Sequence, residues 1–140
     1  MGKGYWEHYS HPADMGIRGF GPTREEAFAQ AALAMTAIIL DPAKIDCRQA
    51  VEVVCEDDDD EMLFWHWLSE LLSEMALRNM VFGRFELQTV NGGLKAIAWG
   101  EKVDRHKHEP AVEVKAATFA DLKVDHARNG TWMAQCVVDV

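Results

Sequence analysis

The first candidates for chemistry are carboxylates that lie at opposite ends of the chain. Asp139 ends a predicted strand and is the next-to-last residue of the chain, so its side chain lies close to the terminal carboxylate of Val140. Joined by a third hard anionic group such as Asp14, these oxygens would suit Mg²⁺ or Ca²⁺ better than a softer metal. The alternative is a frayed terminus that binds nothing, because last residues are commonly disordered.

A second metal-like pattern lies near the N-terminus, where His8, His11 and Asp14 recur every three residues. On a helix this spacing would align three ligands, but Pro12 forces the residue before it into an extended conformation. The stretch 14–16, Asp-Met-Gly, is also typical of a turn in which the Asp side chain bonds the nearby backbone. Spacing alone therefore favours a turn role for Asp14 over a metal-ligand role.

The one basic cluster of this acidic chain is His106-Lys107-His108, flanked by Lys102 and Arg105. In an extended segment the two histidines would share a face, as a zinc pair does. No third ligand lies at a recognised spacing, so the favoured interpretation is a mobile, solvent-facing loop.

Two adjacent charges, Glu113 and Lys115, alternate with the apolar residues of a predicted strand over 112–119. Such charges usually mark the solvent face of a sheet. Lys115 is alternatively placed to offer its ammonium to a partner's carboxylate or to a nucleotide phosphate.

Length and charge restrict the class of protein. The chain has 140 residues, and we expect one domain over 1–140. Asp and Glu number 23 against 14 Lys and Arg, for a net charge of −9. A field of that sign repels phosphate backbones, so we expect no direct nucleic-acid binding. The sequence starts without a signal-like stretch and holds no apolar run long enough for a membrane helix, which predicts a cytoplasmic protein without membrane contact.

The cysteines and the absent motifs narrow the chemistry further. Cys47, Cys55 and Cys136 are an odd number without a C-x-x-C pair, which predicts reduced, buried thiols rather than disulfides or a zinc knuckle. The sequence contains no G-x-S-x-G, no H-E-x-x-H and no phosphate-binding glycine loop. We therefore expect that the chain is not an enzyme.

Two helices must carry the core. Thr23 and Glu26 form a capping box, and apolar residues recur at helical spacing behind it until Asp-Pro at 41–42. The acidic run 57–61 suits the start of a second helix, because the helix dipole favours negative charge there, and 78–79 is its expected end. We interpret the acidic run as a solvated helix start rather than as a cation site.

The other periodic segments predict strands, with a hairpin turn at Asn91-Gly92-Gly93 and a loop over 101–111. The predicted strands are 51–56, 81–88, 94–99, 112–119, 122–125 and 131–139. Together these elements predict an α+β fold, a single-domain sandwich of a mostly antiparallel β-sheet with two main helices packed on one face.

Six blocks of residues occur in the order that they have in a known family. They are YSHPADMGI (9–17), GPTREEAF (21–28), LFWHWLSELL (63–72), WGE (99–101), EVKAATF (113–119) and the final DV (139–140). Over essentially its whole length the chain resembles the archease family. It departs from the usual pattern at Pro12, where the family has threonine, at 111–112, where Gly-Thr is common, and at Ala120, where histidine is frequent.

The resemblance implies a small accessory protein for the RtcB type of RNA ligase. That ligase joins RNA ends in tRNA splicing and RNA repair through a histidine–guanylate intermediate made from GTP. An archease promotes this guanylylation and multiple turnover without being the ligase. The family's Ca²⁺ or Mg²⁺ site carries over onto Asp14, Asp139 and Val140. Lys115 is the first candidate for contact with the ligase, and Glu113 and His106 are further candidates.

Two alternatives stay open from the sequence. One is a chaperone-like binding module for RNA-modifying enzymes such as tRNA methyltransferases. The other is a metal-dependent hydrolase, for which the sequence shows no nucleophile or base constellation.

Overall fold

A computed structural model describes residues 4–12 and 14–140 of the chain. In chain order the elements are β1 (Tyr5–His11), β2 (Asp14–Gly21), α1 (Arg24–Ile39), a short 3₁₀ helix η1 (Pro42–Lys44), β3 (Gln49–Glu56), α2 (Asp60–Arg78), β4 (Met80–Val90), β5 (Gly93–Lys102), α3 (Arg105–His108), β6 (Ala116–Ala117), β7 (Lys123–His126) and β8 (Trp132–Asp139).

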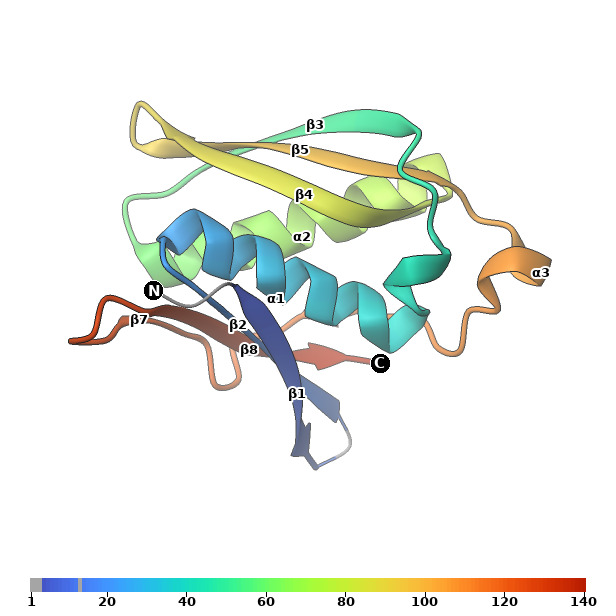
Figure 1. The fold of residues 1–140 in the computed structure, drawn as a ribbon. Coiled ribbons are helices and arrows are strands. Elements are labelled where there is room, and N and C mark those ends of the chain that lie inside the picture. The colour runs from blue at the N-terminus through green and yellow to red at the C-terminus, as the bar shows by residue number, and fades with distance from the viewer. Residues whose placement is uncertain (1–3, 13) are drawn as a thin grey trace.

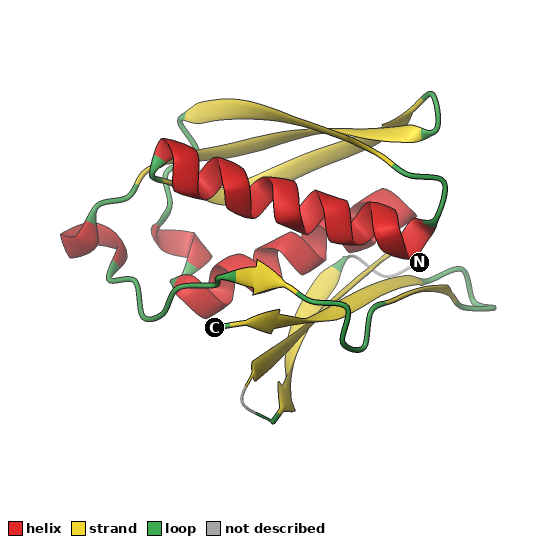
Figure 2. Ribbon diagram, turned by 180° about the vertical axis from the view of Figure 1, so that it is seen from behind, coloured by secondary structure: helices red, strands yellow, loops and turns green. Residues whose placement is uncertain are grey.

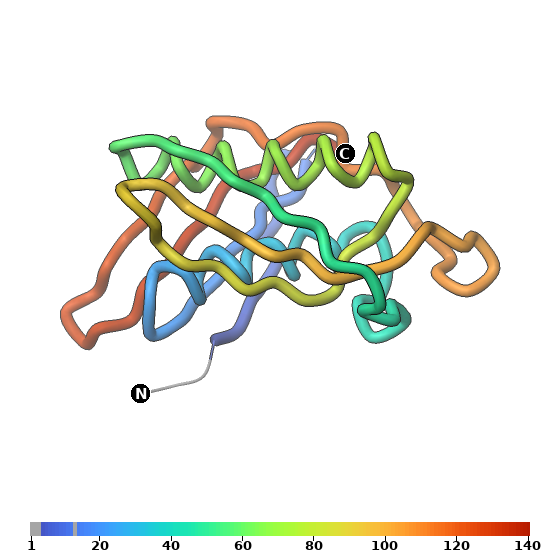
Figure 3. The backbone as a smooth tube through the Cα atoms, turned by 90° about the horizontal axis from the view of Figure 1, so that it is seen from above, coloured from blue at the N-terminus to red at the C-terminus, as the bar shows by residue number. Residues whose placement is uncertain are grey.

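The strands form two antiparallel sheets with the long helices between them. The larger sheet has the order β1-β2-β8-β6, with β7 also paired to β8, and the smaller sheet has the order β3-β5-β4. Figures 1 and 2 show α1 and α2 lying between these two layers, and both helices contact strands of each. Seen from above, the smaller sheet crosses α1, and α2 runs along the side of the sheet where β3 lies (Figure 3). The predicted α+β class is confirmed, and a second sheet covers the helix faces that the prediction left open.

Helix α1 is buried around most of its circumference because a sheet lies on each side of it. A helix that is apolar all round requires such cover. The buried residues are Ala27, Phe28, Ala29, Ala31, Ala32, Ala34, Met35, Thr36 and Ile39. The predicted cap is confirmed, since the Thr23 hydroxyl accepts a hydrogen bond from the Glu26 N–H at 3.1 Å.

Helix α2 begins and ends where its sequence predicts. The Asp59 side chain caps the first turn by accepting from the Met62 N–H at 2.9 Å, and Asn79 ends the helix in the left-handed conformation at φ 53°. The helix is tied to α1 in the core, where the indole N–H of Trp67 donates to the Phe28 carbonyl at 3.1 Å. The acidic run is therefore a helix start, as predicted.

The strand pattern is confirmed in some places and wrong in others. Asn91 and Gly92 take positive φ values of 50° and 78° in the β4–β5 turn, as the predicted hairpin requires. The strands β1 and β2 were not predicted, and the turn interpretation of 14–16 is wrong because Asp14 is the first residue of β2. The loop predicted over 101–111 holds the end of β5 and the short helix α3.

The strand predicted over 112–119 is wrong except at β6. Residues 110–115 form an irregular segment beside α2, held at one end where the Ala111 N–H donates to the Ile39 carbonyl at 2.7 Å. Along it Val112 is 46% exposed whereas Val114 is buried, so these two do not share a face. Tertiary contacts with α1 and α2 outweigh the apolar alternation here.

Close packing of α1 on β2 leads to a first prediction. A Cβ atom at Gly19 would lie 2.2 Å from the Ala27 carbonyl oxygen and 2.3 Å from the Ala31 nitrogen. We expect Gly19→Ala to lower the free energy of unfolding by about 1–3 kcal/mol, since the helix must shift to make room. Urea unfolding measures this. Gly83→Ala is the control, because its added carbon would lie at least 3.2 Å from its neighbours. Equal losses at both positions would contradict this account.

Candidate functional site

The pairing of β2 with β8 brings the two ends of the chain together. Its register places Met15 opposite Val138. Asp14 directly precedes Met15 and Asp139 directly follows Val138, so continuing this register by one residue would set Asp14 opposite Asp139, and Val140 follows directly. Both aspartates are half-buried. The predicted metal ligands thus come from opposite ends of the sequence and meet at one end of the larger sheet.

Alternation along the strands separates the histidines of the N-terminal pattern. Asp14 pairs with His11 across the β1–β2 hairpin, so His11, Asp14 and Asp139 lie on one sheet face. His8 lies on the opposite face, where its Nε2–H donates to the Ala34 carbonyl of α1 at 2.7 Å. The three-residue pattern therefore does not form one site, and His8 has a structural role.

The donor set for a metal is made of hard oxygens. Within 4–12 and 14–140, no three His, Cys, Asp or Glu side chains gather closely enough to hold a metal ion. Asp14 and Asp139 therefore supply two side-chain carboxylates, and the third predicted ligand, Val140, has no donor atom in its side chain. His11 lies in the same row, and its buried Nδ1 has no hydrogen-bond partner within the described residues.

Lys115 is tied to the same end of the sheet. Its backbone N–H donates to the Asp139 carbonyl at 2.8 Å, and Ala116 pairs with Asp139 in β6. Glu113 lies two residues earlier on the irregular segment, and both charged side chains are exposed. The structure thus brings Lys115 next to the candidate carboxylates.

Tyr9 covers the neighbouring part of this sheet face. A Cβ atom at Gly16 would lie 2.2 Å from the Tyr9 ring, so the ring rests directly on the glycine. The hydroxyl donates to Asp121 at 3.2 Å. Burial, together with the negative charge of Asp121, raises the pKa of Tyr9 to about 12, so the hydroxyl stays protonated at neutral pH. Sequence reasoning missed this contact because it depends on the β1–β2 register.

Comparisons with known proteins find relatives that cover almost the whole chain. The sequence profile described as "Archease protein family (MTH1598/TM1083)" matches residues 6–140. The chain belongs to the archease family. It is 45% identical to protein archease of Pyrococcus abyssi over 139 residues, which covers 96% of this chain and 98% of that one. Protein archease of Methanosarcina mazei is 37% identical over 145 residues, with 100% and 98% covered. The solution structure of Methanobacterium thermoautotrophicum protein 1598 is similar at a TM-score of 0.79, with 28% identity and 96% and 98% coverage.

In this archease the basic cluster is folded rather than extended, which corrects the zinc-pair and mobile-loop interpretations. His106 and His108 belong to the helical turn α3, which Figure 1 shows projecting at one side of the molecule. His108 is buried, with its Nδ1 accepting from the Asp104 N–H at 2.9 Å and its Nε2 at 2.9 Å from Glu101. His106 is exposed, and the strand pairing does not bring it to the carboxylate end.

The Glu101 carboxylate contacts two side chains of α3, Lys107 and His108, and so holds α3 against the end of β5. The Lys107 ammonium lies 2.7 Å from both Glu101 and Asp46, and the Asp46 N–H donates to Glu101 at 2.8 Å. Chiefly through Lys107, these contacts lower the pKa of Glu101 to about 2 against the opposing effect of burial.

Two further expectations are tested by the described residues. Cys55 and Cys136 are buried, and burial raises their pKa values to about 11 and about 12, which makes them poor nucleophiles. Cys47 is exposed, so the expectation of a buried thiol is wrong there, because it lies outside the regular elements.

None of the helices within 4–12 and 14–140 is long and apolar enough to cross a membrane.

The Glu101 contacts predict a pH-dependent stability. The pKa of about 2 lies below the ordinary value of 4.5, so the ionised carboxylate stabilises the fold above about pH 4.5 and loses this effect as the pH falls toward 2. Glu101→Gln is therefore expected to lower the free energy of unfolding most at neutral pH, with a difference that shrinks below pH 4.5. Denaturant unfolding at several pH values measures it, and Glu52→Gln, at an exposed site, is the control. If the difference in the free energy of unfolding between Glu101→Gln and wild type stayed constant from pH 7 to pH 2, the ionised Glu101 carboxylate would not be its cause.

Proposed function

We propose that this archease is an accessory activator of an RtcB-type RNA ligase in tRNA splicing or RNA repair. It promotes the ligase's GTP-dependent guanylylation and multiple turnover, and it is not itself an enzyme. One observation carries the proposal, in a chain that belongs to this family over nearly its full length. The β2–β8 pairing brings Asp14 and Asp139 onto neighbouring strands, next to the last β2–β8 pair, and the Lys115 N–H donates to the Asp139 carbonyl.

The residues at this end suit a divalent metal. Asp14, Asp139 and the terminal carboxylate of Val140 would hold Ca²⁺ or Mg²⁺, because both ions prefer several oxygen ligands. When bound, such an ion supplies charge neutralisation for the phosphates of GTP. The protein's own part is to fix two carboxylates on neighbouring strands, so that little ordering is needed on binding.

The charges around the site support a protein partner. The chain carries a net charge of −9, which attracts the basic surface that an RNA-binding ligase must have. Lys115 is exposed next to the carboxylates and offers an ammonium to the ligase active site, and Glu113 extends the contact. His106 is a more distant candidate contact on α3.

The carboxylates are tested by measuring ligase guanylylation from GTP, at catalytic and stoichiometric ratios of this protein. We expect wild type to stimulate the reaction at substoichiometric amounts, and Asp14→Asn or Asp139→Asn to lower the stimulation at least tenfold, because each removes a charged ligand. Asp125→Asn, on exposed β7, is the matched control and should keep full stimulation.

Two results would count against the proposal. Full stimulation by both aspartate variants would exclude a carboxylate-bound metal as the cause. Absence of stimulation by the wild type would favour the chaperone-like alternative, which predicts suppressed aggregation of RNA-modifying enzymes without dependence on the metal.

Lys115 gives a separate prediction. Lys115→Ala removes the ammonium but keeps the backbone N–H that bonds Asp139. We expect weaker stimulation, by about tenfold, with unchanged metal affinity measured by calorimetry. Lys123→Ala, at another exposed lysine, should behave as wild type. An equal loss of metal affinity in Lys115→Ala would show that the lysine acts through the metal site instead.

A further inference from the structure

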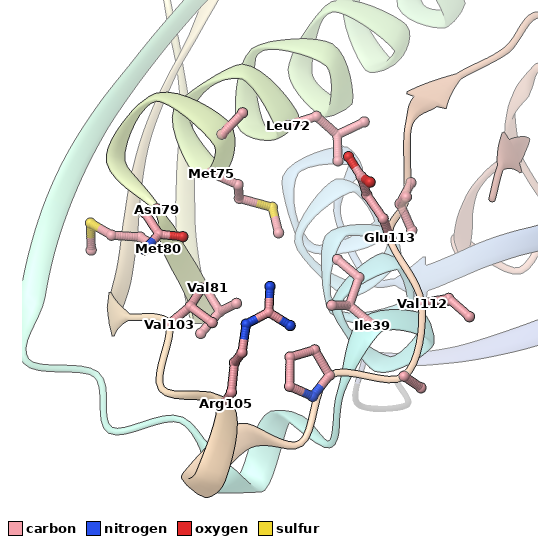
Figure 4. A pocket seen from close by; sticks show the side chains of 14 residues that line it. Ile39, Leu72, Met75, Asn79, Met80, Val81, Val103, Arg105, Val112 and Glu113 are labelled. Atoms are coloured by element: carbon pink, nitrogen blue, oxygen red, sulfur yellow. The ribbon is translucent and has the colours of Figure 1, made fainter.

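A cavity of about 530 Å³ lies beside the second half of α2, away from the helix start. Figure 4 shows its walls, which come from the end of α1, from α2, from the start of β4 and from the irregular segment. Its lining residues are Ile39, Leu72, Met75, Ala76, Asn79, Met80, Val81, Val103, Arg105 and the run 110–114.

Part of the cavity lining is apolar and adaptable. Ile39, Met75 and Val81 belong to it, and the Met75 side chain extends toward the middle of the cavity (Figure 4). Methionine in such a place adjusts its shape to different apolar groups. This part of the lining therefore suits an aliphatic or aromatic side chain.

One cation projects into this apolar setting. The Arg105 guanidinium points into the cavity, and the Glu113 carboxylate lies on another side of it (Figure 4). Within the described residues, Arg105 takes part in none of the ion pairs. An unpaired guanidinium beside apolar surface is a ready partner for a carboxylate. Charge complementarity thus calls for an anionic group next to an apolar one.

The hollow continues along α2. A second hollow of about 360 Å³ shares Leu72, Ala76, Glu113 and Val114 with the first and reaches Lys115 and Trp65. We call the two hollows together the α2 groove. Leu77, which is 83% exposed on the last turns of α2, adds apolar surface on the same half of the helix.

The groove fits a protein segment better than a free small molecule. Ala76, Arg105 and Val112 line it and are exposed, so its walls are open to solvent. Small-molecule sites usually bury most of their ligand, whereas a segment of a protein can add contacts outside the hollow. We propose that the α2 groove docks a partner protein's segment in which an apolar side chain lies next to a carboxylate. The carboxylate binds Arg105 and the apolar group enters above Met75.

This surface reaches the carboxylate site only at Lys115 and needs no metal, so it is tested without the ligase. The probes are two blocked dipeptides, acetyl-Leu-Glu-amide and acetyl-Leu-Gln-amide, which differ in charge alone. Each is titrated into the ¹⁵N-labelled chain, and the amide signals of Ala76, Arg105 and Val112 are followed. We expect the acidic peptide to shift these signals at millimolar concentrations and to bind at least fivefold more tightly than the amide. Equal affinities, or shifts confined to other surfaces, would overturn the proposal.

Three exposed positions provide matched variants. Arg105→Glu reverses the cation, Ala76→Trp fills the groove, and Arg128→Glu makes the same charge change in the β7–β8 connection, which Figure 1 shows at the other end of the molecule from α3. We expect the first two to abolish the shifts caused by the acidic peptide and the third to leave them unchanged. Dispersed spectra and unchanged thermal midpoints confirm that each variant folds.

Undiminished binding by Arg105→Glu would refute the assigned anion site. The other possible occupant of the groove is a second copy of this chain, and sedimentation tests for it. A wild-type dimer that Ala76→Trp dissociates would assign the groove to self-association and overturn the proposal. A monomer that keeps the peptide response supports it, whether or not the chain stimulates a ligase.

Discussion

The antiparallel pairing of β2 with β8 is the constraint on which most of the molecule depends. It joins the N-terminal hairpin to the last strand, and its register decides which side chains face α1 and which face outward. Ile17 and Cys136 are fully buried in this pairing, while Asp14 and Asp139 fall on the opposite face. A slip by one residue would exchange the two sets, so the core and the candidate site are fixed by the same hydrogen bonds.

The position of α1 between two sheets explains several sequence features that have no local cause. Its many alanines are needed because both sides of the helix must approach a sheet closely, and Gly19 completes that approach on β2. Trp67 fills the space beside α1, and its indole N–H donates a hydrogen bond to the Phe28 carbonyl in the core.

Features set by local rules could be predicted from the sequence. Thr23, Asp59 and Asn79 define helix ends by capping alone, and Asn91-Gly92 defines a hairpin. The irregular segment and the burial of His108 could not be predicted, because they depend on distant partners. For the site, the metal-binding carboxylates near the chain end stay a prediction, and only the β2–β8 register indicates that Asp14 and Asp139 lie on neighbouring strands. The α2 groove was missed because its walls are far apart in sequence.

The irregular segment 110–115 physically connects the two candidate surfaces. It forms one wall of the α2 groove, and single backbone hydrogen bonds of 2.7 and 2.8 Å hold its ends to Ile39 and Asp139. Without the ladder of bonds that a strand would have, this backbone can shift at low cost. A side chain docked in the groove therefore presses on the segment whose far end bonds Asp139. Lys115 thus lies at the end of this irregular segment, one residue before β6, whereas Asp14 and Asp139 lie in the long strands β2 and β8.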